Sequence, residues 1–146
     1  MTKSFSLIAA LLLSLPLAAQ AETPAEQFMS TWDRDRNGIA TLAELEAMRG
    51  DVFASFDANE DGMLDLEEHA IFDEARANDV AGYEGKQREQ MQKMADGMRM
   101  EATDANGDRL VSLDEFQTST VKWFAQLDKN GDGGITLADL AMKPAQ

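Results

Sequence analysis

One acidic segment of twelve residues recurs four times in this chain and restricts its fold more than any other feature. The copies begin at Asp33, Asp57, Asp104 and Asp128, so their starts are 24, 47 and 24 residues apart. In every copy the first position is Asp, the third and fifth are Asp or Asn, and the twelfth is Glu or Asp. Two carboxylates about 4 Å apart near a protein surface repel each other by roughly 4 kcal/mol. A folded chain therefore needs something that holds these clusters together.

A bound divalent cation would do so. Ca²⁺ takes six to eight oxygen ligands, and a twelve-residue loop can supply them from positions 1, 3 and 5, the backbone carbonyl of 7, and positions 9 and 12. Position 6 favours Gly, because the chain turns there with a positive φ. The residues at the six ligand positions of the four loops are Asp33, Asp35, Asn37, Ile39, Thr41 and Glu44; Asp57, Asn59, Asp61, Met63, Asp65 and Glu68; Asp104, Asn106, Asp108, Leu110, Ser112 and Glu115; and Asp128, Asn130, Asp132, Gly134, Thr136 and Asp139.

With these loops the sequence resembles the EF-hand family, which implies an all-α fold with one helix entering and another leaving each loop. Apolar residues at the spacing of one helical face precede the first, second and fourth loops, and a weaker set precedes the third. In each loop the residue at position 9 stands three before the acid at position 12, as in a capping box. We expect two pairs of EF-hands with short antiparallel bridges between paired loops. Residues 22–77 would form the first pair, residues 78–90 a linker and residues 91–146 the second pair.

The loops depart from the family pattern in different ways. The second loop is the most complete, whereas the first has Asn37 in place of an acid and only Ala40 at position 8, which predicts loose pairing. The third carries Arg109 where Gly is expected, and a non-Gly residue at positive φ costs on the order of 1 kcal/mol. The fourth ends in Asp139, whose shorter side chain would favour Mg²⁺ or weaker Ca²⁺ binding. We predict that affinity falls from the second loop to the first and then to the other two.

Only twelve residues separate the first two loops (45–56) and the last two (116–127). This interval allows two short helices, with a break at Gly50 and Asp51, or one nearly continuous helix. The rise of an α-helix is about 1.5 Å per residue. The spacing is tighter than in the calmodulin type of lobe and is similar to that of exported bacterial EF-hand proteins.

A polar connector beginning at Ala77 joins the two halves. Gly82 and Gly85 indicate a joint, followed by a predicted helix from about Lys86 to Ala102. One face of that helix carries Met91, Met94, Ala95 and Met98. We favour the interpretation that this face is the core of the third hand's entering helix. The alternative is an adaptable, Met-rich binding surface.

The first 21 residues have the pattern of a secretory signal peptide. Lys3 is followed by an apolar run from Leu7 to Leu17 and by the Ala19-Gln20-Ala21 cleavage pattern. That run is short for a membrane span of about 20 residues, and a retained signal anchor is the alternative. The chain has no Cys, so lipidation at a cleavage-site cysteine is impossible. We expect an exported protein, located in the periplasm or secreted.

The mature chain would run from Glu22 to Gln146 and carry a net charge of −15, because Lys3 is the only charged residue removed from a chain of charge −14. This acidity argues against nucleic acid and membrane surfaces as partners. His69 is the only histidine, and without a second histidine or a cysteine it forms no transition-metal site. The sequence has no nucleophile–base pair, phosphate-binding Gly loop or HExxH motif, so we expect no enzymatic activity. We also expect a monomer.

Three functions fit these features. The first is an exported calcium buffer or sensor whose fold depends on its metal, since each half is small enough to need such support. The second is an interaction module in which calcium exposes the Met-rich face to a protein target. The third is lanthanide binding, because signal peptide, four hands and close spacing partly resemble lanmodulin. That family has Pro at position 2 and Asp at position 9, whereas here only Asp65 among the position-9 residues is acidic.

Overall fold

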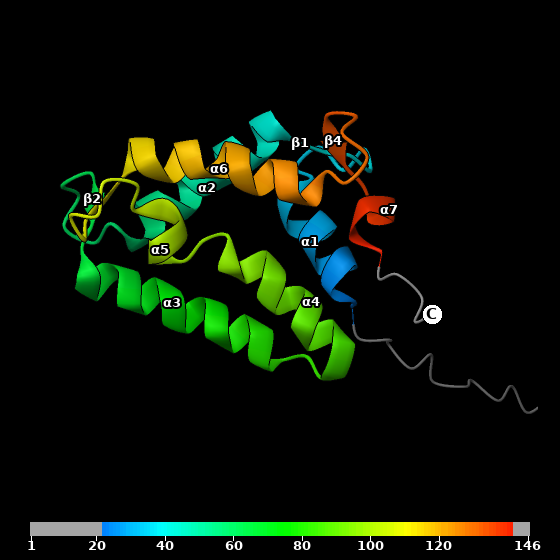
Figure 1. The fold of residues 1–146 in the computed structure, drawn as a ribbon, viewed down its shortest axis with the longest axis horizontal. Helices are drawn as coiled ribbons and strands as arrows, with labels where there is room; N and C mark the ends of the chain where they lie inside the picture. The colour runs from blue at the N-terminus through cyan, green and yellow to red at the C-terminus, as the bar shows by residue number, and fades with distance from the viewer. Residues whose placement is uncertain (1–21, 142–146) are drawn as a thin grey trace, which may run out of the picture.

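The computed structural model describes residues 22–141, which form seven helices and four two-residue strands (Figure 1). In chain order these elements are α1 (Pro24–Trp32), β1 (Ala40–Thr41), α2 (Leu42–Phe56), β2 (Met63–Leu64), α3 (Leu66–Ala81), α4 (Gly85–Asp96), α5 (Met100–Thr103), β3 (Val111–Ser112), α6 (Leu113–Leu127), β4 (Gly134–Ile135) and α7 (Leu137–Leu140). The expected all-α fold, with helix–loop–helix units and short antiparallel bridges between loops, is confirmed. The predicted signal peptide lies outside the described residues.

Helices α2 and α6 each belong to two hands at once. Each is a continuous helix of 15 residues, which corresponds to a length of about 22 Å. α2 leaves the first loop and enters the second, and α6 leaves the third loop and enters the fourth. The possible break at Gly50 is not formed, and Asp51 accepts a hydrogen bond from Arg34 at 3.0 Å instead of capping a helix.

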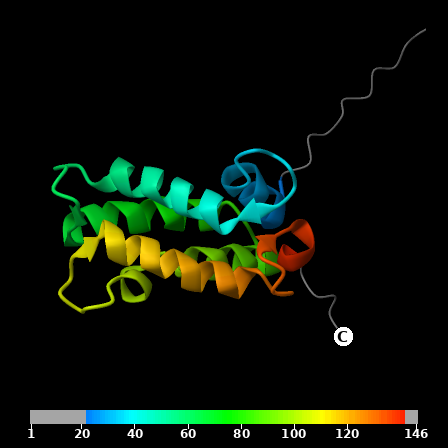
Figure 2. The same ribbon diagram turned by 90° about the horizontal axis from the view of Figure 1, so that it is seen from above.

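The predicted pairing of neighbouring loops is wrong. β1 of the first loop pairs with β4 of the fourth, with Ala40 opposite Ile135. β2 of the second loop pairs with β3 of the third, with Leu64 opposite Val111. Figure 2 shows the reason, because α2 and α6 run side by side in opposite directions and bring these loop ends together. Two loops at opposite ends of one helix cannot reach each other, so residues 22–77 do not form a pair of bridged loops on their own.

Each bridged loop pair has its own hydrophobic cluster. At the end with the first and fourth loops, the buried cluster consists of Phe28, Trp32, Ala40, Leu45, Met94, Trp123, Phe124, Ile135 and Leu140. At the other end, it consists of Phe53, Leu64, Phe72, Val111 and Phe116. The position-8 residues of all four loops are completely buried. Ala40 is among them, because Ile135 on the opposite strand covers it. The loose pairing predicted for the first loop is therefore not observed.

Arg49 connects α2 and α6 between the two clusters. Its Nη2 atom donates a hydrogen bond to Ser119 Oγ at 2.9 Å, and its guanidinium lies 4.0 Å from the ring centroid of Phe116. Within the described residues its Nε and Nη1 atoms have no partner. Burial, and then the charge of Arg76, lower the pKa of Arg49 to about 9. The two shared helices are thus joined through a buried cation.

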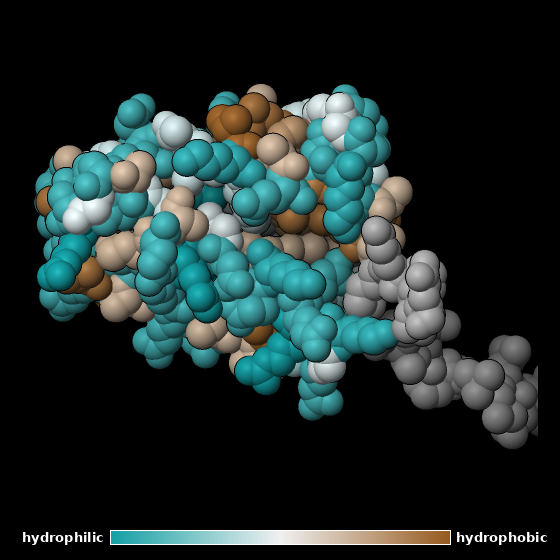
Figure 3. Space-filling model, in the orientation of Figure 1, coloured by the Kyte–Doolittle hydropathy of each residue, from teal (hydrophilic) through white to brown (hydrophobic). Residues whose placement is uncertain are grey.

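Helices α3 and α4 form a second layer against α2 and α6, with α1 and α7 at one end (Figure 1). The predicted connector helix, α4, is shorter than expected and ends at Asp96. Gly97 follows it, at a position where an added Cβ atom would lie 2.0 Å from Cδ1 of Trp123. Met94 is buried in the core, as the favoured interpretation of the methionine face predicts, but it belongs to the cluster at the first and fourth loops, and α5 is the helix that enters the third loop. In residues 22–141, no helix is both long and apolar enough to cross a membrane. The face shown in Figure 3 is mostly hydrophilic.

Candidate metal-binding loops

The acid at position 12 of each loop is held by the start of the leaving helix. In the first loop Glu44 Oε2 accepts hydrogen bonds from the Thr41 amide at 2.9 Å and from Thr41 Oγ1 at 2.8 Å, and the Glu44 amide donates to Thr41 Oγ1 at 3.3 Å. This is the capping box that the sequence predicts. Equivalent boxes begin α3 at Asp65 and α6 at Ser112. The last ligand position of these loops is therefore placed by local sequence.

The same acid also reaches across its loop. Glu44 Oε1 accepts hydrogen bonds from the amides of Arg34 and Asp35 at 3.0 and 3.2 Å, near the loop's beginning. Glu68 Oε1 makes the same contacts with the amides of Ala58 and Asn59, at 2.8 and 3.3 Å. Both carboxylates thus lie between the first and last residues of their loops, where an ion bound by both ends would sit.

The Asp at position 1 fixes the turn in the middle of each loop. In the first loop Asp33 accepts hydrogen bonds from the amides of Asn37 and Gly38 at 3.1 and 2.8 Å. Asp57, Asp104 and Asp128 accept two amide bonds each in the same part of their loops. The first and last ligand positions are therefore ordered by the backbone itself, and their oxygens already face the amides of the loop.

All four loops share one backbone shape, with positive φ at positions 4 and 6. The residues at these positions are Arg36 and Gly38, Glu60 and Gly62, Gly107 and Arg109, and Gly131 and Gly133. The third loop adopts this shape although its position 6 is not glycine, and Arg109 has φ 67°. The sequence-based expectation for that position is confirmed.

Replacing this arginine by glycine should therefore stabilise the protein. We expect Arg109→Gly to raise the free energy of unfolding by about 1 kcal/mol, because glycine adopts positive φ without steric cost. Thermal unfolding at fixed calcium measures the change. Leu110→Gly, one residue further along the loop and outside the positive-φ positions, is the matched control and should not stabilise. Equal or lower stability of Arg109→Gly would show that the side chain offsets its strain by other contacts.

The first loop shows the closest approach of its carboxylates. Oxygens of Asp33, Asp35 and Glu44 all lie within 4.8 Å of one another. Ligands on opposite sides of a Ca²⁺ ion are about 4.6–5.2 Å apart, twice the usual oxygen distance. These three side chains therefore fit a calcium-sized ion with little rearrangement. In residues 22–141 no other set of three acids or histidines lies so close together. The predicted affinity order, with the second loop first, remains a prediction.

In the first, second and fourth loops an Asn side chain at position 3 or 5 donates a hydrogen bond to a neighbouring acid of the loop. Asn37 Nδ2 donates to Asp35 Oδ2 at 2.8 Å, and the amides of Asn59 and Asn130 likewise bond the position-5 acids Asp61 and Asp132 at 3.0 Å. The residues at position 7 contribute only a backbone carbonyl in the predicted set, and three of them, Ile39, Met63 and Leu110, have exposed side chains. Those at position 9 are engaged with position 12. A position-9 side chain held in this way suits a ligand that contacts the ion through a water molecule.

Local hydrogen bonds lower the pKa of three position-12 acids, Glu44, Glu115 and Asp139. The Thr41 amide lowers the pKa of Glu44, and the amide and hydroxyl of Ser112 lower the pKa of Glu115. Burial alone would raise the pKa of Asp139, but hydrogen bonds from Thr136 outweigh it and the pKa is lowered. All three carboxyls therefore remain charged, as a metal ligand must be.

A lowered pKa in the folded state makes stability depend on pH. The contribution of such a carboxyl is complete above its unfolded pKa and is lost as the pH falls through the lower folded value. We expect the chelated protein, held folded by a constant concentration of an osmolyte such as sucrose, to lose stability progressively below about pH 4.5. Urea unfolding between pH 6 and pH 3 measures this slope, and Glu115→Gln should flatten it. Asp114→Asn, the exposed neighbour on the same helix, is the control. A slope that Asp114→Asn flattens equally would contradict the role of the hydrogen bonds.

Comparison with known proteins identifies the same motif in two places. Residues 50–68 and 120–142 match the family model described as EF hand. These segments contain the second and fourth loops with the last turns of their entering helices. The chain is also 25% identical to a calcium-binding protein, LPS1-alpha, of Lytechinus pictus. The alignment covers 82% of this chain and 54% of the relative, so the chain spans about half of that protein's length. The EF-hand family is thereby supported for this chain, and with it calcium binding.

Proposed function

We propose that this chain is an exported calcium-binding protein that takes one ion in each of its four loops and acts as a buffer. The observation that carries this proposal is the common loop geometry. All four loops have positive φ at positions 4 and 6 and a position-1 Asp that accepts two loop amides. The first and third loops share this shape with the two that match the family model.

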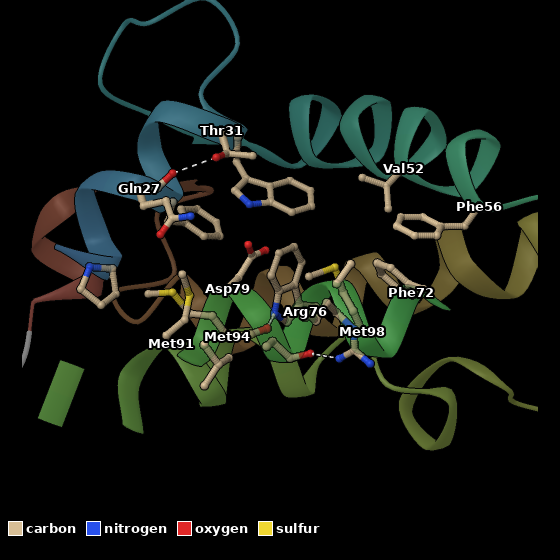
Figure 4. A pocket seen from close by; sticks show the side chains of 17 residues that line it. Gln27, Thr31, Val52, Phe56, Phe72, Arg76, Asp79, Met91, Met94 and Met98 are labelled. Atoms are coloured by element: carbon tan, nitrogen blue, oxygen red, sulfur yellow. Dashed lines mark hydrogen bonds between the residues drawn. The ribbon is translucent and has the colours of Figure 1, made fainter. Parts of the chain in front are cut away.

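A buffer fits the structure better than a target-binding sensor. The methionine face that a sensor would present is largely packed inside, with Met94 buried beside Phe28 and Trp123 (Figure 4). The two shared helices also bridge all four loops, so one loop pair cannot open by swinging a helix without moving the other pair. The EF-hand assignment favours a binding protein over an enzyme.

Isothermal titration of residues 22–146 with calcium tests this function. We expect a stoichiometry of four ions. Substituting a position-12 acid by its amide, as in Glu44→Gln, Glu68→Gln, Glu115→Gln or Asp139→Asn, should remove one ion or weaken it at least about tenfold, because a charged ligand is lost. A stoichiometry of two would show that only two of the four loops bind calcium. Failure to bind calcium at millimolar concentration would overturn the proposal.

Two finer points need their own measurements. Export is proposed from the first 21 residues, and the mass of the protein purified from its native host should match a chain beginning at Glu22. Calcium is proposed over lanthanides because position 2 lacks Pro in all four loops. Competition of calcium with a lanthanide ion tests that preference, and Mg²⁺ binding is expected first at the loop that ends in Asp139.

A further inference from the structure

Three of the four loops contain an asparagine that is followed directly by glycine. The pairs are Asn37–Gly38, Asn106–Gly107 and Asn130–Gly131. In the second loop, by contrast, Asn59 is followed by Glu60. Asparagine is thermolabile, because the amide nitrogen of the next residue can attack its side-chain carbonyl carbon. Glycine favours this attack, since it has no side chain that obstructs the approach and its backbone is the least restricted.

The folded loops hold the reacting groups apart. The amide of Gly107 donates a hydrogen bond to Asp104 Oδ1 at 2.7 Å, and Asn106 Oδ1 accepts one from the Asp108 amide at 2.8 Å. The attack needs the Gly107 nitrogen without its proton and close to Cγ of Asn106, so both hydrogen bonds oppose it. The corresponding glycine amides of the first and fourth loops are bonded in the same way. The reaction therefore requires an opened loop, and its rate follows the population of that state.

The third loop protects its asparagine least. In the first and fourth loops the amide group that would leave is itself bonded, to Asp35 at 2.8 Å and to Asp132 at 3.0 Å. Asn106 is bonded through Oδ1, and within the described residues its Nδ2 atom has no such partner. Arg109 also holds a positive φ of 67° in this loop, and opening releases that strain. The fourth loop has glycine at both positive-φ positions and lacks this strain.

We propose that Asn106 is a site of spontaneous deamidation that reacts when the third loop holds no ion. The Gly107 nitrogen loses its proton to a solvent base and forms a bond to Cγ of Asn106. The bond from Cγ to Nδ2 breaks, and Nδ2 leaves as ammonia with a proton from solvent. Water then opens the cyclic imide at either carbonyl carbon. One product is aspartate, and the other is isoaspartate, in which the backbone runs through the former side chain.

The two products have opposite effects on the loop. Aspartate keeps the backbone and places a carboxylate at position 3, as Asp35 does in the first loop. Isoaspartate lengthens the backbone between positions 3 and 4, so it disrupts the bonds of Asp104 to the amides of Gly107 and Arg109. The isoaspartate form should therefore lose its ion. This effect on occupancy rests on the proposed calcium function, whereas the reactivity of the empty loop does not.

Mass spectrometry of proteolytic peptides measures the reaction at each asparagine separately. Residues 22–146 are incubated at mildly alkaline pH in three states: unfolded in urea, folded without calcium in EDTA and sucrose, and saturated with calcium. In urea we expect the three Asn–Gly pairs to react alike and Asn59 to react much more slowly. These rates give the intrinsic reactivity of each site, against which the protection by the fold is measured.

The folded states should separate the sites. In EDTA and sucrose we expect Asn106 to react about fivefold faster than Asn37 or Asn130, the effect of about one hydrogen bond. Calcium at one hundred times its Kd should slow the reaction at Asn106 about a hundredfold, because about one loop in a hundred is then empty.

Arg109→Gly separates the effect of structure from that of sequence, because it leaves Asn106 and Gly107 unchanged. In EDTA and sucrose it should slow the reaction at Asn106 about fivefold, since the relaxed loop opens less often. In urea it should leave the rate unchanged. Leu110→Gly is the matched control and should not slow the reaction.

Three results would each overturn the proposal. They are equal rates at Asn106, Asn37 and Asn130 in the folded chain without calcium, equal effects of the two variants, and a rate at Asn106 that calcium does not change in a chain that binds four ions. A chain that takes up no calcium overturns the calcium proposal instead, and the order of the rates in EDTA and sucrose then still decides this one.

Discussion

Removal of calcium with a chelator is expected to unfold much of this protein at neutral pH. A ligand that binds only the folded state stabilises it by about 4 kcal/mol at one thousand times its Kd. Four such sites contribute as much as the whole stability of an ordinary domain, about 5–15 kcal/mol. Without the ions, the acids of each loop repel one another, and the chain carries a net charge of −14. The bridge between Ala40 and Ile135 must then be closed at the full entropic cost of a long loop.

Circular dichroism and tryptophan fluorescence measure this effect. We expect EDTA to lower the helical signal and expose Trp32 and Trp123, and excess calcium to restore both. Glu68→Gln should weaken the recovery at low calcium, whereas Glu67→Gln, which removes the same charge from the neighbouring exposed residue, should not. Spectra that are identical with and without the chelator would show that the two hydrophobic clusters alone hold the fold.

The loops could be predicted from the sequence because their structure is local. The capping box of Thr41 and Glu44 joins residues three positions apart, and the contacts of Asp33 reach only to Gly38. Spacing within twelve residues therefore determines the positions of the ligands, the start of each leaving helix and the positive φ at Arg109. The all-α fold followed from repeating this unit four times.

The pairing of the loops could not be predicted in this way, because it is decided by contacts between distant segments. The interval from the first loop to the second permits two short helices or one. The structure forms one, with α6 packed closely against Gly50, where the nearest atom to an added Cβ would be Gln117 Nε2 at 3.3 Å. Arg49 and Ser119, whose hydrogen bond fixes the two helices, are 70 residues apart. No local pattern indicates either contact.

The end of the connector helix at Asp96 could not be predicted for the same reason. Gly97 lies in the middle of a helical pattern, and only the packing of the Trp123 indole against it explains why no side chain fits at this position. The sequence also predicts a linker over residues 78–90, whereas α3 continues to Ala81 and buries Val80.

Truncation of Trp123 is expected to be the most damaging single substitution in the core. The side chain is 2% exposed, contacts the rings of Phe28 and Trp32 and covers Gly97. Its Nε1 atom donates a hydrogen bond to the Met94 carbonyl at 3.0 Å, which joins α6 to α4. Replacing such a buried side chain by alanine lowers the free energy of unfolding by about 3–5 kcal/mol. The orphaned carbonyl adds to this cost.

We therefore expect Trp123→Ala to lower the free energy of unfolding of the calcium-bound protein by about 3–5 kcal/mol, and the Tm by roughly 15 °C. Trp123→Phe keeps an aromatic ring but loses the hydrogen bond, so its loss should be intermediate. Val121→Ala, at an exposed position of the same helix, should change stability by less than about 0.5 kcal/mol. Thermal unfolding at saturating calcium separates these values. If Trp123→Ala were no more harmful than Val121→Ala, then α4 would not be held to α6 through this indole.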